Sequence, residues 1–173
     1  MSDDGGTIYF SAQSTEGASV DTLPTAVFTV PSRGGDAVIL ARGAPLEDVV
    51  GLLLSCDGNT LYLADRPVEL TADSQLLYTL NVESQAFTPL PHTGIGEAVG
   101  LAFNADCSVL YVTGFTPEGT PALFILSPDG GDATIVTSGG PLTSPDGVFV
   151  DIDNIAWVMI TNQRAPSVAP CGR

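Results

Sequence analysis

The chain has 173 residues, of which 20 are Asp or Glu and only 5 are Lys or Arg, so its formal net charge is −15. A charge of this sign repels phosphate backbones and anionic headgroups, which argues against nucleic acid and membrane as partners. No apolar run approaches the roughly 18 residues of a membrane-spanning helix. The hydrophobic residues, 44% of the chain, are distributed over many short segments instead.

The beginning of the chain lacks a basic region followed by an apolar run, so no signal peptide is expected in it. The compartment stays open, and a secreted or periplasmic parent protein is one alternative. Cys56, Cys107 and Cys171 are an odd number of cysteines without CxxC spacing, which argues against a zinc site and a complete disulfide framework. Buried or tolerated thiols are expected, with a Cys56 to Cys107 bridge as the alternative in an oxidising compartment.

Short β-rich runs separated by turn signals follow one another along the chain, and none has sustained helical periodicity. Four units are expected: 1–43, 44–91, 92–139 and an incomplete 140–173. The first begins at the second strand of a four-stranded pattern, with strands over 7–12, 25–30 and 36–41. The next two are complete, with strands over 49–55, 60–64, 75–81 and 86–90, then over 98–103, 109–113, 121–126 and 133–137. The last unit has only the strands 147–151 and 155–160.

An internal repeat supports these units. The segments that start at Val30 and Leu126 match without gaps and share the sequence GGDA. The first strand of each later unit opens at a glycine, Gly51, Gly100 or Gly147, and these are spaced 49 and 47 residues apart. Four-stranded units of this length are typical of β-propeller blades. The sequence therefore predicts an all-β fold, a β-propeller with about three and a half blades in the chain.

Three stretches resemble known propeller repeats. SPDGVFVDIDNIAWV (144–158) resembles the repeat of the NHL and gluconolactonase-like six-bladed propellers, whereas VLYVTGF (109–115) and LFILSPDGGDATIV (123–136) resemble the YVTN-type repeat. The resemblance implies a six-bladed ring and makes Asp146 a candidate ligand of a divalent metal in the channel. Val50 and Val99 stand where that family places further polar ligands. The alternative role of Asp146 is to cap its own turn.

Because a propeller ring needs about four to eight blades, three and a half blades cannot close one. The chain is expected either to join a second copy head to tail, as a homodimer of about six blades, or to require a complementary propeller half. An open superhelical arc is the structural alternative.

The loops on the channel side of the predicted ring contain the remaining candidate residues for a ligand face: Arg42, Glu47, Asp48, His92 and Glu97. A mouth rich in carboxylates suits calcium or another divalent cation, and its plainer interpretation is a solvated acidic rim. His92 is the single histidine, and no G-x-S-x-G sequence accompanies it, so no Ser-His-Asp triad is expected.

Two functions follow from these observations. The favoured one is a non-catalytic propeller segment without a cofactor, an assembly or binding module that self-associates through exposed blade edges. The alternative is half of a metal-dependent gluconolactonase-like hydrolase in which Asp146 is one ligand. In either case Leu53, Phe103 and Phe149 are expected to pack between blades.

Overall fold

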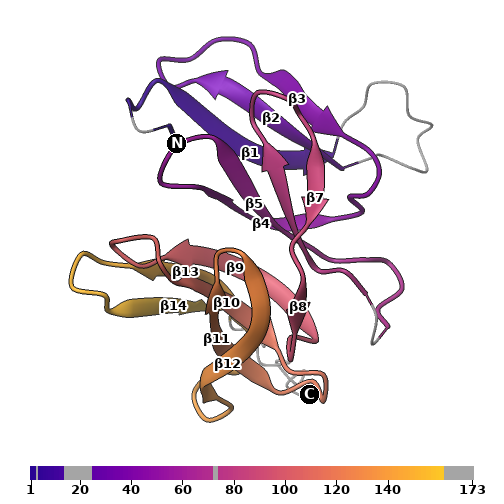
Figure 1. Ribbon diagram of the computed structural model, residues 1–173, viewed down its shortest axis with the longest axis vertical. Coiled ribbons are helices and arrows are strands. Elements are labelled where there is room, and N and C mark those ends of the chain that lie inside the picture. The colour runs from indigo at the N-terminus through magenta and orange to yellow at the C-terminus, as the bar shows by residue number, and fades with distance from the viewer. Residues whose placement is uncertain (3, 14–24, 72–73, 162–173) are drawn as a thin grey trace, which may run out of the picture.

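The computed structural model describes residues 1–2, 4–13, 25–71 and 74–161, so Cys171 lies outside the described residues. Fourteen strands occupy these ranges. No helix among the described residues is long and apolar enough to cross a membrane. The strands form four sheets that follow one another along the chain as blades (Figure 1).

The sheets, which we call the first to fourth blades, differ in strand number. The first contains β1 (Thr7–Gln13), β2 (Thr25–Pro31) and β3 (Val38–Arg42). The second contains β4 (Val49–Leu54), β5 (Thr60–Asp65), β6 (Leu77–Asn81) and β7 (Phe87–Pro89). The third has the order β8 (His92–Thr93), β12 (Gly130–Ser138), β11 (Pro121–Ser127), β10 (Leu110–Phe115) and β9 (Glu97–Phe103), and the fourth has β13 (Pro145–Val150) and β14 (Ala156–Ile160).

All strands expected from the sequence are present, and consecutive strands within each blade pair antiparallel. The short strand β8 was not expected. It pairs in parallel with β12, with His92 opposite Gly131, and so adds a fifth strand to the outer edge of the third blade. A two-residue strand is too short to have an alternation of apolar and polar residues, so no sequence pattern predicts it.

The turn between the two inner strands of a blade has the same chemistry in every blade. In the second blade the Ser55 hydroxyl donates to the Asp57 carboxylate at 2.5 Å, and the Asn59 N–H donates to the same oxygen at 3.1 Å. A carboxylate that accepts bonds from its own turn favours that turn over extended backbone. Equivalent bonds go to Asp4, Asp106 and Asp151.

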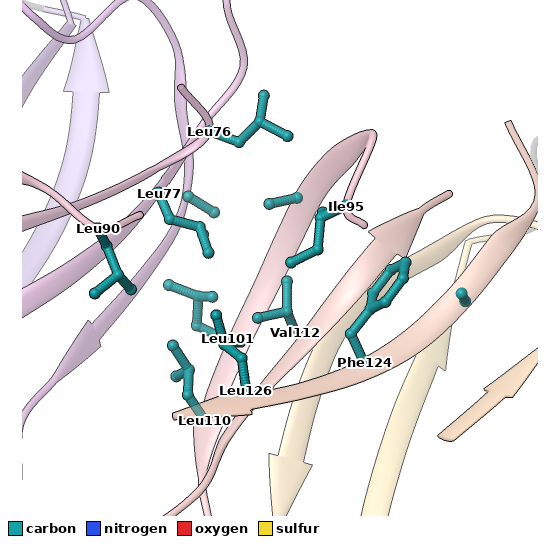
Figure 2. Packing of buried hydrophobic residues seen from close by; sticks show 12 residues of the cluster. Leu76, Leu77, Leu90, Ile95, Leu101, Leu110, Val112, Phe124 and Leu126 are labelled. Atoms are coloured by element: carbon teal, nitrogen blue, oxygen red, sulfur yellow. The ribbon is translucent and has the colours of Figure 1, made fainter. Parts of the chain in front are cut away.

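The core lies between blades. One cluster joins the second and third blades, and Figure 2 shows Leu76, Leu77 and Leu90 opposite Leu101, Leu110 and Leu126. A second cluster joins the first and second blades around Val27, Leu61 and Leu63. Each blade therefore depends on its neighbours for burial, as expected of a repeat array.

The three residues expected between blades differ in position. Leu53 pairs with Tyr62 across the second blade and contacts the core that the second and third blades share. Phe103 is on the face of the third blade that is turned toward the second blade. There its ring contacts the ring of Tyr62 edge-on at 5.1 Å. Phe149 is 64% exposed, so its expected burial is wrong for this structure, because no further blade covers it among the described residues.

The cysteine interpretation is also corrected. Cys56 and Cys107 form a disulfide, with their Cα atoms 6.4 Å apart, rather than remaining thiols. Both lie in the turns between inner strands, in the second and third blades. The third and fourth blades are linked at the corresponding place by a hydrogen bond, which the N–H of Ala105 donates to Asn154 Oδ1 at 3.0 Å. The bridge is thus a covalent form of a contact that recurs between blades.

Glycine allows the inner strands of adjacent blades to approach closely. A Cβ atom at Gly51 would collide with the backbone oxygen of Val99. At Gly100 a Cβ atom would lie 2.5 Å from the backbone oxygen of Asp146, whereas at Gly147 it would meet nothing within 4 Å. Gly147 holds the same position in its blade as Gly51 and Gly100, but among the described residues no neighbouring strand lies against it.

Candidate functional site

A buried carboxylate organises the loop that leads into the second blade. Asp65, only 2% exposed at the end of β5, accepts the backbone N–H groups of Glu47 at 3.1 Å and Asp48 at 2.9 Å. Burial raises the pKa of Asp65, and these two hydrogen bonds counteract part of that rise. Asp65 thereby fixes the backbone on which two of the predicted ligand-face residues stand.

The side chains of this loop bind the segment after β5. Arg66 Nη2 lies 2.6 Å from Asp48 Oδ2, and Arg66 Nε donates to the same oxygen at 3.1 Å. Glu47 Oε2 accepts the backbone N–H of Val68 at 2.6 Å. Exposed ion pairs of this kind contribute little stability. Their effect here is to position Arg66.

Arg66 reaches a hollow on the channel side of the arc, about 600 Å³ in volume. Glu97 at the start of β9 and Asp146 in β13 supply its negative charge. Val50 and Val99 line it between them. The hollow therefore combines one guanidinium, two carboxylates and an apolar wall, a mixture that suits a small polar molecule or a peptide side chain.

This donor set does not fit a resident divalent cation. Calcium takes about six to eight oxygen ligands, whereas Asp146 shares the hollow with one other carboxylate, and Arg66 adds a positive charge that opposes a cation. Within the described ranges, no group of three or more His, Cys, Asp or Glu side chains is arranged to hold a metal ion.

The other predicted residues lie elsewhere. Arg42 ends β3, opposite Ala26 in β2. His92 lies in β8 at the outer edge of the third blade, where its Nδ1 is 3.1 Å from the backbone oxygen of Leu90. The structure thus brings Glu47 and Asp48 together around Asp65, and Glu97 and Asp146 together beside Arg66.

Sequence reasoning did not single out Asp65 or Arg66. The available signal was the charged pair Asp65 and Arg66 at the end of the strand TLYLAD. The third blade has Gly114 and Phe115 at the corresponding positions. An acid that ends a buried strand needs partners for its oxygens, and here the following loop supplies them.

Comparison with solved structures identifies the fold. A putative TolB from Agrobacterium tumefaciens is similar over 88% of this chain, with 18% identity and a TM-score of 0.65. A chain of a nidogen/laminin complex is similar over 85%, with 18% identity and a TM-score of 0.64. A gluconolactonase from Xanthomonas campestris is similar over 78%, with 24% identity and a TM-score of 0.53. These likenesses show that the chain has a β-propeller fold.

The chain spans about half the length of these three structures, 49% of each. No protein-family model matches the chain, and comparison with curated proteins gives no match. The similar structures come from proteins with different names and roles, so they show the architecture of this chain. Its function has to be inferred from its own residues.

Proposed function

We propose that the chain is a non-catalytic propeller segment, an assembly and binding module that closes its ring by joining a second copy of itself head to tail. The observation that carries this proposal is the contrast among the inner-strand glycines. Gly51 and Gly100 lie against the backbone of the next blade, whereas Gly147 faces open space. Among the described residues, no further blade lies against the fourth at this position.

The end faces have the composition of buried surfaces. On the fourth blade Phe149 is 64% exposed, Trp157 61% and Met159 63%. On the first blade the rings of Phe10 and Phe28 stack at 5.3 Å, and both Ile8 and Phe10 are exposed. Apolar area removed from water contributes about 25 cal/mol per Å², and contiguous exposed patches of this kind mark association sites.

Two copies complement each other because the deficits of the two ends differ. Within the ranges that the structure describes, the fourth blade has only an inner pair of strands, β13 and β14, and the first blade has three strands with β1 at its edge. A head-to-tail pair related by two-fold symmetry presents the fourth blade of each copy to the first blade of the other. The pair then has about six blades, within the range that closes a propeller ring.

Light scattering on the full chain at micromolar concentration tests this proposal. The expected mass is twice 17.8 kDa. Phe149→Ser combined with Trp157→Ser should shift the equilibrium to monomer. Ile135→Ser with Val136→Ser is the matched control, since these residues are 48% and 51% exposed on β12, away from both end faces. A folded monomer at all accessible concentrations would contradict the proposal.

A second candidate function is part of a gluconolactonase-like hydrolase with Asp146 as one metal ligand. It rests on the two carboxylates of the channel-side hollow, Asp146 and Glu97, which in a single chain are fewer oxygen ligands than calcium takes. Calorimetric titration with calcium separates the two functions. We expect weak, salt-sensitive binding and no lactone hydrolysis, whereas tight stoichiometric binding abolished by Asp146→Ala would favour the hydrolase.

A further inference from the structure

The third blade contains a hydrogen-bond chain that joins three strands. Gly100 N–H in β9 donates to Thr113 Oγ1 in β10 at 3.0 Å. The same hydroxyl donates to the backbone oxygen of Asp146 in β13 at 2.5 Å. An inner-strand glycine, a hydroxyl on the second strand and the next inner strand are therefore connected at one buried point.

The first blade contains the second of these two hydrogen bonds, from the hydroxyl to the next inner strand. Ser11 stands two residues after Tyr9, as Thr113 stands two residues after Tyr111. The Ser11 hydroxyl donates to the backbone oxygen of Val49 in β4 at 3.0 Å. However, β1 is the edge of its sheet, so no inner strand stands beside Ser11 to provide the glycine N–H.

The fourth blade contains the inner-strand glycine of the first hydrogen bond but no hydroxyl at the corresponding place to accept its N–H. Gly147 is the inner-strand glycine, and the place of the hydroxyl, two residues after Trp157, is taken by Met159. Met159 has no hydroxyl and is 63% exposed. β13 is anchored to β9 and β10 of the third blade, whereas the extensive contacts of β14 are with β13 alone. The inner strand is thus firmly held, and its second strand is not.

From these two incomplete arrangements we infer that β13 of one copy is the missing inner strand of the first blade in a second copy. It pairs antiparallel with β1 of that copy, displaces β14 from this position, and donates the Gly147 N–H to Ser11 of the second copy. This inference rests on the proposed self-association and specifies which strands are shared. In Figure 1, β1 lies in the upper half of the molecule and β13 in the lower half, with β4 and β5 labelled between them, so the exchange is between copies.

The exchange also solves a problem of strand number. If both copies kept β14 and β1 in the shared blade, two strands would compete for the position next to β13. With β14 displaced, β13 and the first sheet of the second copy form a blade of four strands. Each copy then supplies two blades of its own and part of two shared ones, which gives a ring of six.

The register of the shared pair follows from the complete blades. Leu53 stands opposite Tyr62, and Ala102 stands opposite Tyr111. The corresponding pair is Phe149 opposite Tyr9 of the second copy. Residues directly opposite in an antiparallel pair have Cα atoms about 4.5 to 5.5 Å apart, a separation that a disulfide can bridge.

The test is a cysteine cross-link in a Cys171→Ser background. Mild oxidation of the Tyr9→Cys, Phe149→Cys variant should give a covalent dimer on a non-reducing gel. The matched control is Ile8→Cys with Phe149→Cys, because adjacent residues of a strand point to opposite faces, and it should stay unlinked. A control that links as efficiently would overturn the exchange.

A second variant covers the case in which Tyr9→Cys perturbs folding. Ser11→Ala removes the hydroxyl at both symmetric contacts and should raise the dimer dissociation constant about tenfold, with recovery in Ser11→Thr. A dimer that forms without the cross-link and is indifferent to Ser11→Ala would overturn the strand exchange and leave the self-association proposal intact. A monomer would overturn both.

Discussion

At the scale of single residues, Asp65 is the buried acid that holds the loop leading into the second blade. It is buried, and its carboxylate accepts hydrogen bonds from two backbone N–H groups of the same loop, those of Glu47 and Asp48. Because the loop backbone points its donors at this carboxylate, removing the carboxylate leaves those donors without their acceptor.

The first prediction is that Asp65→Ala destabilises the fold by about 2 kcal/mol, since two hydrogen bonds to a charged group are lost. Asp48→Ala, which removes the exposed ion pair with Arg66, should cost under about 1 kcal/mol. Urea unfolding of the two variants measures the difference. Equal effects would show that the ion pair, rather than the buried acceptor, holds the loop.

The second prediction concerns acid. Bonds from Ser55 and Asn59 lower the pKa of Asp57 below its ordinary value of 3.8. A lowered pKa means that Asp57 contributes stability above the pKa of the unfolded chain and loses it as pH falls through the folded pKa. Asp65 has a raised pKa and acts in the opposite direction, because its protonation relieves the cost of a buried charge.

Asp57→Asn should therefore flatten the fall in stability between about pH 5 and pH 2. The urea midpoint, followed across that range for the variant and the parent chain, measures this. Asp153→Asn is a suitable control, because Asp153 is an exposed acid in the turn between β13 and β14. The same flattening in the control would mean that general charge repulsion, not the turn, governs acid unfolding.

At the scale of elements, the regularity of the repeats decided what the sequence could predict. The Asp turns and the glycine-opened strands placed the strands correctly, because both patterns are local. Leu53 and Phe103 both pack between the second and third blades, as expected, but from opposite faces of their own strands, because Phe103 stands one residue beyond the position that corresponds to Leu53. A shift of one residue reverses the face of a side chain, and the sequence does not mark that shift.

Features that join distant parts of the chain were not predicted as the favoured interpretation, for another reason. The disulfide, the parallel strand β8 and the buried partners of Asp65 all join segments that are distant along the chain or lie in loops. The candidate-site residues could be identified as loop acids, but their grouping around Asp65 and Arg66 depends on how the blades pack against one another.

The third prediction compares two equivalent glycines. Gly100→Ala should destabilise the chain by about 1 to 3 kcal/mol, because its Cβ would overlap the backbone of β13. Gly147→Ala should leave the monomer within about 0.5 kcal/mol of the parent and weaken self-association. Thermal unfolding of dilute samples and light scattering measure the two effects. A Gly147→Ala chain that associates normally would argue against close approach at the fourth blade.

The fourth prediction concerns the inter-blade bridge. Cys56 and Cys107 are separated by 51 residues. Closing a loop of that length stabilises a fold by about 4 kcal/mol in the chain-entropy account. Cys56→Ser with Cys107→Ser should lower stability by up to that amount in denaturant unfolding, and a reducing agent should do the same to the parent chain. No response to either would show that the second and third blades are held by their apolar cluster alone.

At the scale of the whole molecule, the chain is an arc whose two ends are apolar and whose surface is strongly acidic. The core between the second and third blades shows what a complete junction contains: leucines from both blades and inner strands in close approach (Figure 2). The free faces of the first and fourth blades have the same kind of residues without a partner. Charge and apolar surface therefore act on association in opposite directions.

The fifth prediction follows from that opposition. Each copy has a formal net charge of −15, so two copies repel each other at low ionic strength, while the end faces proposed to join them are apolar. Salt shortens the Debye length from about 14 Å near 50 mM to about 4 Å near 500 mM. The dimer dissociation constant should thus fall severalfold over this range in sedimentation equilibrium. The Phe149→Ser, Trp157→Ser chain should stay monomeric throughout, because screening cannot replace lost apolar contact. A dissociation constant that rises with salt would mean that ion pairs, not the apolar end faces, join the copies.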